Sequence, residues 1–125
     1  MKRVMVDMSC TLLHHGHIRL LRKAADLGRV IVALTTDDEI LTKKGYMPEL
    51  SFEERKEILI AVKYVSEVIP SKWLLDDDYI RKNKIDILVH GDDNSNNISA
   101  CELVIFPRTP SVSSSNLRQK ASQNI

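Results

Sequence analysis

Short runs of apolar and β-branched residues alternate along this chain with longer segments whose apolar residues recur at the period of a helix. The runs that we predict to be strands are "RVMVDM" (3–8), "VIVALT" (30–35), "SEVIP" (66–70), "IDILVH" (85–90) and "ELVIF" (102–106). Strands that alternate with helices at this spacing are typical of a parallel sheet. The sequence therefore predicts an α/β fold in which helices flank a parallel sheet.

Start and stop signals mark the segments between these strands. Gly28 is predicted to end the first helix, Ser51 and Glu54 form a capping-box pattern, and Pro70 is predicted to stop the strand that precedes it. The predicted helices are 15–28, 37–43, 51–65, 76–83 and a weak terminal helix at 115–122, with a loop at 43–50.

Composition narrows the class of protein. The chain has 125 residues, 43% of them hydrophobic, which suits one domain over residues 1–125 with one core. Its net charge of +1 predicts neither a nucleic-acid partner nor an acidic membrane surface. Cys10 and Cys101 form no CxxC pair, which favours a reducing cytoplasm. We expect no signal peptide and no membrane insertion, since no apolar run approaches the roughly 20 residues of a membrane span.

Three polar clusters follow predicted strands. They are "MSCTLLHHGH" (8–17), "HGDDNSNN" (90–97) and "PRTPSVSSS" (107–115). Ligands of parallel α/β sheets bind beyond the carboxyl ends of the strands. We therefore expect the three clusters to form a single site.

The histidines of the first cluster allow three interpretations. The first is a metal site, because His14 and His17 are three residues apart and share a helix face near Cys10, although a catalytic zinc usually has three committed ligands. The second is that they are solvated residues of a polar helix start. The third interpretation is a phosphate site, in which Gly16 lets a phosphate approach the backbone at a helix N-terminus and both imidazoles donate hydrogen bonds.

Taken together, the motifs resemble those of the cytidylyltransferases of the HxGH nucleotidyltransferase superfamily, in particular the glycerol-3-phosphate and ethanolamine-phosphate types. The resemblance runs from Val4 to Leu117 through "LLHHGHIRLLRKAADLG", "FEERKEI", "KYVSEVIP", "HGDD" and "PRTPSVSSSNL". It implies a single Rossmann-like domain. It also implies a cytoplasmic, homodimeric enzyme that joins CTP to a small phosphorylated alcohol or a phosphonate, with Mg²⁺ held mainly by the CTP phosphates and no metal ligands from the protein.

The resemblance also implies roles for individual residues. The catalytic residues would be His14, His17 and Lys44, with Lys43 as the second candidate for the lysine. The nucleotide-binding residues would be Ser9, Gly16, Asp93, Arg108, Thr109, Ser113, Ser114 and Ser115. The acceptor-binding residues would be Arg55, Lys63 and Trp73. A core tryptophan is an equal alternative for Trp73.

Departures from the family pattern keep alternatives open. Where the family usually has Gly-Thr-Phe-Asp, this chain has Met8, Ser9, Cys10 and Thr11, and Pro110 follows Thr109 where the family has an acid. Phosphoethanolamine, phosphocholine and phosphonates remain possible acceptors. An adenylyltransferase and a catalytically weak nucleotide-binding domain remain alternative functions.

Overall fold

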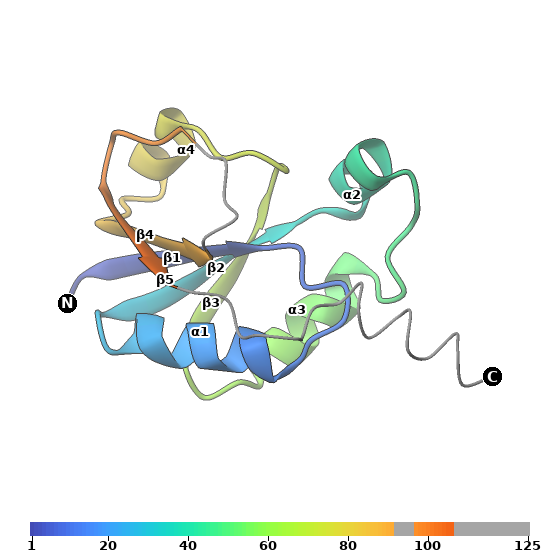
Figure 1. Cartoon of the computed structure of the whole chain (residues 1–125), viewed down its shortest axis with the longest axis horizontal. Coiled ribbons are helices and arrows are strands. Elements are labelled where there is room, and N and C mark those ends of the chain that lie inside the picture. The colour runs from blue at the N-terminus through green and yellow to red at the C-terminus, as the bar shows by residue number, and fades with distance from the viewer. Residues whose placement is uncertain (92–96, 107–125) are drawn as a thin grey trace.

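The computed structural model of this chain describes residues 1–91 and 97–106, and within them five strands alternate with four helices (Figure 1). The strands are β1 (Arg3–Met8), β2 (Arg29–Thr35), β3 (Val65–Ser71), β4 (Ile87–Gly91) and β5 (Glu102–Phe106). The helices are α1 (His15–Ala25), α2 (Asp37–Lys44), α3 (Phe52–Ile60) and α4 (Asp77–Lys82). The terminal helix predicted at 115–122 lies outside the described residues.

The strands form one sheet in the order β3-β2-β1-β4-β5, and every neighbouring pair is parallel. The α/β fold with a parallel sheet is thus confirmed. The chain builds the sheet outward from β1 to β3, then returns to the other side of β1 to add β4 and β5. This order puts a topological switch point between β1 and β4, where such sheets bind ligands beyond the carboxyl ends of the strands.

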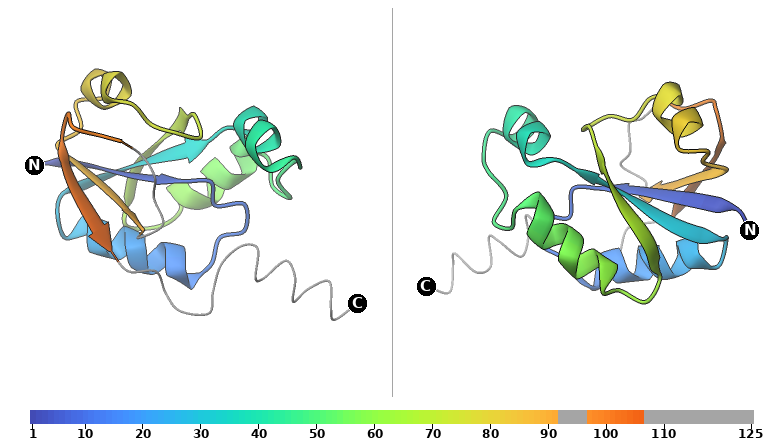
Figure 2. Two further views of the ribbon diagram at one scale, coloured as in Figure 1. Left: turned by 45° about the horizontal axis from the view of Figure 1, so that its top comes forward. Right: turned by 180° about the vertical axis from the view of Figure 1, so that it is seen from behind.

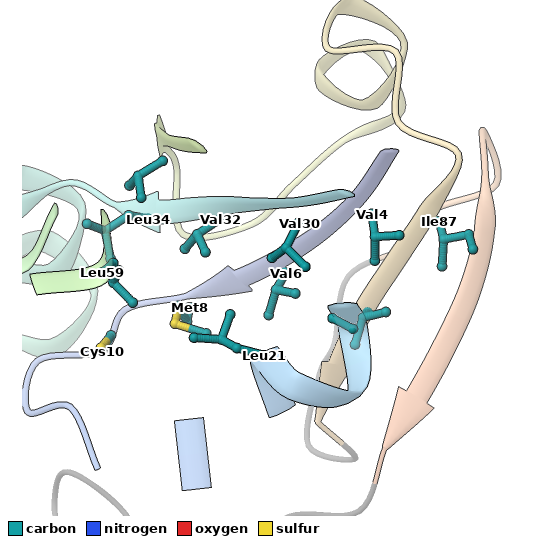
Figure 3. Close-up of a cluster of buried hydrophobic side chains, with 13 residues drawn as sticks. Val4, Val6, Met8, Cys10, Leu21, Val30, Val32, Leu34, Leu59 and Ile87 are labelled. Carbon is teal, nitrogen blue, oxygen red and sulfur yellow. The ribbon is translucent and has the colours of Figure 1, made fainter. Parts of the chain in front are cut away.

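Residues of β1 alternate between two apolar clusters, one on each face of the sheet. Val4, Val6 and Met8 belong to the larger cluster, which also contains Leu21 of α1 and Leu59 of α3 (Figure 3). Met5 belongs to the smaller cluster on the opposite face, together with Ile80 of α4. Helices α1 and α3 therefore cover one face and α4 the other, as the views in Figure 2 show.

Several predicted boundaries were wrong. Helix α1 ends at Ala25 with Asp26 as its C-cap, three residues before Gly28. Gly28 is needed for close approach instead, because a Cβ atom there would lie 2.3 Å from the carbonyl oxygen of Lys2. Pro70 does not stop β3, which continues to Ser71; an edge strand tolerates proline.

The predicted limits of the helices also need correction. Helix α3 ends at Ile60, five residues before the predicted end at Val65, and its Ile58 is 38% exposed. Helix α2 includes Lys44 and ends against Gly45, whose φ of 77° fits a left-handed C-cap. Lys43 and Lys44, which were predicted in the loop at 43–50, therefore belong to the helix. None of the helices in the described part of the chain is long and apolar enough to span a bilayer.

Candidate active site

The N-terminus of α1 is capped by the two motif histidines. His14, the N-cap residue, accepts a hydrogen bond at Nδ1 from the backbone N–H of Gly16 at 3.1 Å. His17 accepts one at its own Nδ1 from the backbone N–H of His14, also at 3.1 Å. The pattern is a capping box in which two imidazoles replace the usual hydroxyl and carboxylate. A neutral imidazole that accepts at Nδ1 carries its proton on Nε2, so each ring keeps an Nε2–H as a donor.

The two imidazoles lie close together, with ring centroids 3.9 Å apart. Burial, with a smaller contribution from His14, lowers the pKa of His17 to about 3. His17 is therefore neutral at physiological pH. It can donate a hydrogen bond to a phosphate oxygen without first losing or gaining a proton, which suits stabilisation of charge that develops during a reaction.

The position of this pair in the fold favours an anionic ligand. Helix α1 begins beyond the carboxyl end of β1, beside the switch point. No acidic residue occupies its first turn. The partial positive charge of a helix N-terminus attracts phosphate groups, and here no carboxylate of that turn opposes it.

Metal binding at the histidines has less support. Burial raises the pKa of the Cys10 thiol to about 12, which disfavours the thiolate that ligates zinc. The described residues contain no group of three or more His, Cys, Asp or Glu side chains placed to hold a metal ion.

Arg55 of α3 connects the loop after β1 to its surroundings. The side chain is 1% exposed and donates hydrogen bonds to the carbonyl oxygens of Ser9 at 2.7 Å and Thr35 at 2.9 Å. It also bonds the carbonyl oxygen of Leu50 at 3.1 Å and the Asp37 carboxylate at 2.6 Å. Residue 10 adopts a left-handed backbone, with φ of 51°, directly after Ser9. Arg55 thereby fixes the turn that leads to the histidines.

A second group of side chains lies where β2 and β3 end. The backbone N–H of Trp73 donates to Glu39 Oε1 of α2 at 2.8 Å. The Nζ atom of Lys44, in the last turn of the same helix, lies 5.5 Å from the centroid of the Trp73 ring. Because the carboxyl ends of parallel strands meet at one edge, this group and the histidines occupy the same edge of the sheet.

Comparison with known proteins identifies the family. A family model described as cytidylyltransferase-like matches residues 11–120. The chain belongs to the cytidylyltransferase-like family. It is 38% identical over 128 residues to the glycerol-3-phosphate cytidylyltransferase of Staphylococcus aureus, a match that covers 96% of this chain and 95% of that protein.

A second relative and one solved structure are also similar to this chain. The chain is 36% identical over 97 residues to the ethanolamine-phosphate cytidylyltransferase of Arabidopsis thaliana, which covers 73% of this chain but 23% of that protein. The crystal structure of the lipopolysaccharide core biosynthesis protein from Thermoplasma volcanium GSS1 has a similar fold. Its TM-score is 0.73 at 21% identity, and the match covers 86% of this chain and 98% of that one.

The surroundings of two of the predicted acceptor residues, Arg55 and Lys63, do not support that role. Arg55 was predicted to bind the acceptor phosphate, but its guanidinium is buried and bonded to carbonyl groups and Asp37, which gives it a positioning role. Lys63 lies in the turn before β3, at the opposite edge of the sheet from the histidines, with its Nζ 5.1 Å from the centroid of the Tyr64 ring. The Arg55 guanidinium is thus bonded to the backbone of the loop before the histidines, and Lys63 lies at the edge of the sheet away from them.

The structure brings the remaining described candidates to the expected edge. Ser9, His14, Gly16 and His17 lie in or after the loop that follows β1, and Lys44 and Trp73 lie beyond β2 and β3. The other predicted nucleotide-binding residues fall outside the described residues, and these are Asp93, Arg108, Thr109, Ser113, Ser114 and Ser115.

Glu39 and the positioning role of Arg55 were not predicted from the sequence. Glu39 carried no motif signal, because its function is to accept one backbone N–H from a loop 34 residues away. For Arg55 the signal was its place among apolar residues, between Phe52 and Leu59, which indicates a side chain on the buried helix face.

Proposed function

We propose that this protein is a cytidylyltransferase that joins CTP to glycerol 3-phosphate, giving CDP-glycerol and pyrophosphate. The observation that carries the proposal is the pair of Nδ1-bonded histidines at the start of α1, beside the switch point of the sheet. The choice of acceptor rests on the 38% identity to a glycerol-3-phosphate cytidylyltransferase over nearly the full length of both chains.

In the proposed reaction, a phosphate oxygen of glycerol 3-phosphate attacks the α-phosphorus of CTP. The new bond joins that oxygen to the α-phosphorus, and the bond between the α-phosphorus and the bridging oxygen breaks, so that pyrophosphate leaves with the electron pair. The acceptor phosphate is already an anion near neutral pH, so no strong general base is needed. The protein contributes positioning and charge stabilisation.

Each proposed catalytic group has a place in this scheme. The Nε2–H groups of His14 and His17 donate to oxygens of the CTP phosphates as negative charge shifts toward the leaving group. Lys44, exposed at the end of α2, supplies a mobile positive charge. Magnesium is proposed to be held mainly by the CTP phosphates, where it would neutralise charge on the leaving pyrophosphate, and no protein ligand set is assigned to it.

The test is an assay of pyrophosphate release and of the nucleotide product by mass spectrometry. Glycerol 3-phosphate with CTP and Mg²⁺ should give CDP-glycerol, and ATP should replace CTP poorly. Phosphoethanolamine, phosphocholine and 2-hydroxyethylphosphonate complete the acceptor panel. Activity with ATP rather than CTP would indicate an adenylyltransferase. No turnover with any pair, despite measurable CTP binding, would indicate a nucleotide-binding domain.

A specific similarity keeps phosphoethanolamine as the second candidate acceptor. The chain matches an ethanolamine-phosphate cytidylyltransferase at 36% identity, although over a smaller share of both proteins. The acceptor panel separates the two candidates by their kcat/KM values.

We further propose a cytoplasmic homodimer. Both cysteines are free thiols, which suits a reducing compartment. Edge strand β3 and the exposed Ile58 and Ile60 of the neighbouring α3 offer apolar surface near the "KYVSEV" segment. Light scattering of the active protein at tens of micromolar should give twice the chain mass, and a monomer would contradict the proposal.

A further inference from the structure

The face of the Trp73 ring is occupied by a cation of the protein itself. Lys44 Nζ lies 5.5 Å from the ring centroid, within the distance at which an ammonium group is attracted to an indole face. Both residues stand at the carboxyl edge of the sheet, where the proposed reaction takes place. An indole face at such an edge is otherwise a favourable site for the ammonium group of a ligand.

The loop that carries Trp73 is fixed to its neighbours by backbone hydrogen bonds. Glu39 Oε1 accepts from the N–H of Trp73 at 2.8 Å, and the carbonyl oxygen of Ser71 accepts from the N–H of Thr36 at 3.2 Å. Tyr79 Oη donates to the carbonyl oxygen of Pro70 at 2.6 Å. Lys44 is likewise attached to a helix whose first turn is bound to this loop through Glu39. Helix α2 thus carries Lys44 and also anchors the loop that carries Trp73.

We propose that Lys44 acts as a charge filter on the acceptor, so that the enzyme accepts uncharged polyol phosphates and rejects acceptors that carry an ammonium group. This inference rests on the proposed cytidylyltransferase function. An ammonium group of phosphocholine or phosphoethanolamine would have to displace Lys44 from the Trp73 ring and then remain beside it. Like charges a few ångströms apart repel, and the lysine is tethered to α2, so its charge stays near the ring even when it turns toward a phosphate.

A polyol phosphate meets no such opposition. Its hydroxyl groups carry no charge, and its phosphate is attracted by the same lysine. One side chain can thus favour the phosphate that every acceptor shares and oppose the ammonium group that only some acceptors carry. We expect the filter to be worth on the order of tenfold in kcat/KM, the usual range of a cation–π contact at a partly exposed site.

The test compares acceptors within each variant, so that a general loss of activity cancels. The quantity is the ratio of kcat/KM for glycerol 3-phosphate to kcat/KM for phosphocholine. Lys44→Gln should lower this ratio on the order of tenfold, although it lowers both activities. The matched control is Lys72→Gln, which removes the same charge from an exposed residue next to Trp73 and should leave the ratio unchanged. In a Trp73→Leu background, where no ring face is left for either cation, adding Lys44→Gln should lower the ratio less than it does in the wild type.

Trp73 is the only tryptophan of the chain, so its fluorescence gives a readout that does not need turnover. Lys44→Gln should change the emission of the free protein and strengthen the response to added phosphocholine, whereas Lys72→Gln should do neither. An unchanged acceptor ratio in Lys44→Gln, or a wild-type preference for phosphocholine, would overturn the filter while leaving the cytidylyltransferase function intact. If no acceptor reacts, the proposed function fails. In that case, a fluorescence response that is the same in the wild type and in Lys44→Gln overturns the filter as well.

Discussion

Replacing Arg55 with methionine should destabilise the fold far more than removing any surface arginine. Methionine keeps much of the length of the side chain but no donor. The carbonyl oxygens of Ser9, Thr35 and Leu50 would each lose a hydrogen bond, and the Asp37 carboxylate would lose its ion-pair partner. Removing one partner of a buried ion pair costs about 3–5 kcal/mol. Since a domain of this size is stabilised by about 5–15 kcal/mol, the loss would be a large fraction of the whole.

Urea denaturation followed by circular dichroism measures the free energy of unfolding. The matched control is Arg81→Met, because the Arg81–Asp78 pair is exposed, with side chains 65% and 95% accessible. An exposed pair contributes about 0–1 kcal/mol, so this variant should behave like the wild type. If Arg55→Met lies within about 1 kcal/mol of Arg81→Met, the network around Arg55 does not hold the site together as argued.

Arg55→Lys separates charge from geometry. Lysine keeps the positive charge beside Asp37, but one ammonium group cannot reach acceptors on four separate segments as a guanidinium does. We expect intermediate stability and a turnover rate that falls more than CTP affinity, because the turn at Ser9 would hold the histidines less firmly. Full turnover in a stable Arg55→Lys protein would show that charge alone suffices.

Four further outcomes follow from the structure. His14→Asn should keep much of the stability that His14→Ala loses, since asparagine can also cap α1, yet both should lower kcat on the order of 10²-fold, because neither has the Nε2–H donor. For His17, the unfolded chain takes up a proton below pH 6.5 while the folded protein resists it down to about 3. The free energy of unfolding should therefore fall as the pH drops, by about 2 kcal/mol at pH 5, a slope that His17→Asn should lack. Lys44→Ala should lower kcat/KM for CTP by about tenfold or more and Lys43→Ala less, and equal small effects would contradict a role for Lys44. Gly28→Ala should lower stability by about 1–3 kcal/mol in thermal unfolding, since its Cβ would collide with the backbone of Lys2.

Local patterns predicted most of the fold, because its elements obey local rules. The apolar runs in β2 and β5 are continuous, polar clusters follow β1 and β5, and Ser51 with Glu54 forms the capping box that the sequence indicated. Local rules wrongly placed the end of β3 at Pro70. A proline is tolerated in a strand that lies at an edge, and strand order is a property of the whole sheet.

The site was predictable where residues adjacent in sequence act together, as His14, Gly16 and His17 do. It was less so where roles depend on distant partners. The family resemblance suggested a phosphate contact for Arg55, but Arg55 is 46 residues from Ser9 and meets it only in the folded chain. Lys63 was wrongly expected at the site for a related reason. It comes just before the amino end of β3, and in a parallel sheet the amino ends lie at the edge opposite the ligand.

The histidine pair shows how the proposed nucleotide site and a helix start can coincide. At the N-terminus of α1 the backbone needs acceptors for its first N–H groups, and the Nδ1 atoms of His14 and His17 provide them. Using Nδ1 as the acceptor places the proton of a neutral imidazole on Nε2, the atom that can donate to a ligand. A serine or aspartate would cap the helix equally well but would present no N–H group, and an aspartate would repel phosphate. An imidazole therefore accepts from the helix with one ring nitrogen and can donate with the other, which neither serine nor aspartate can do.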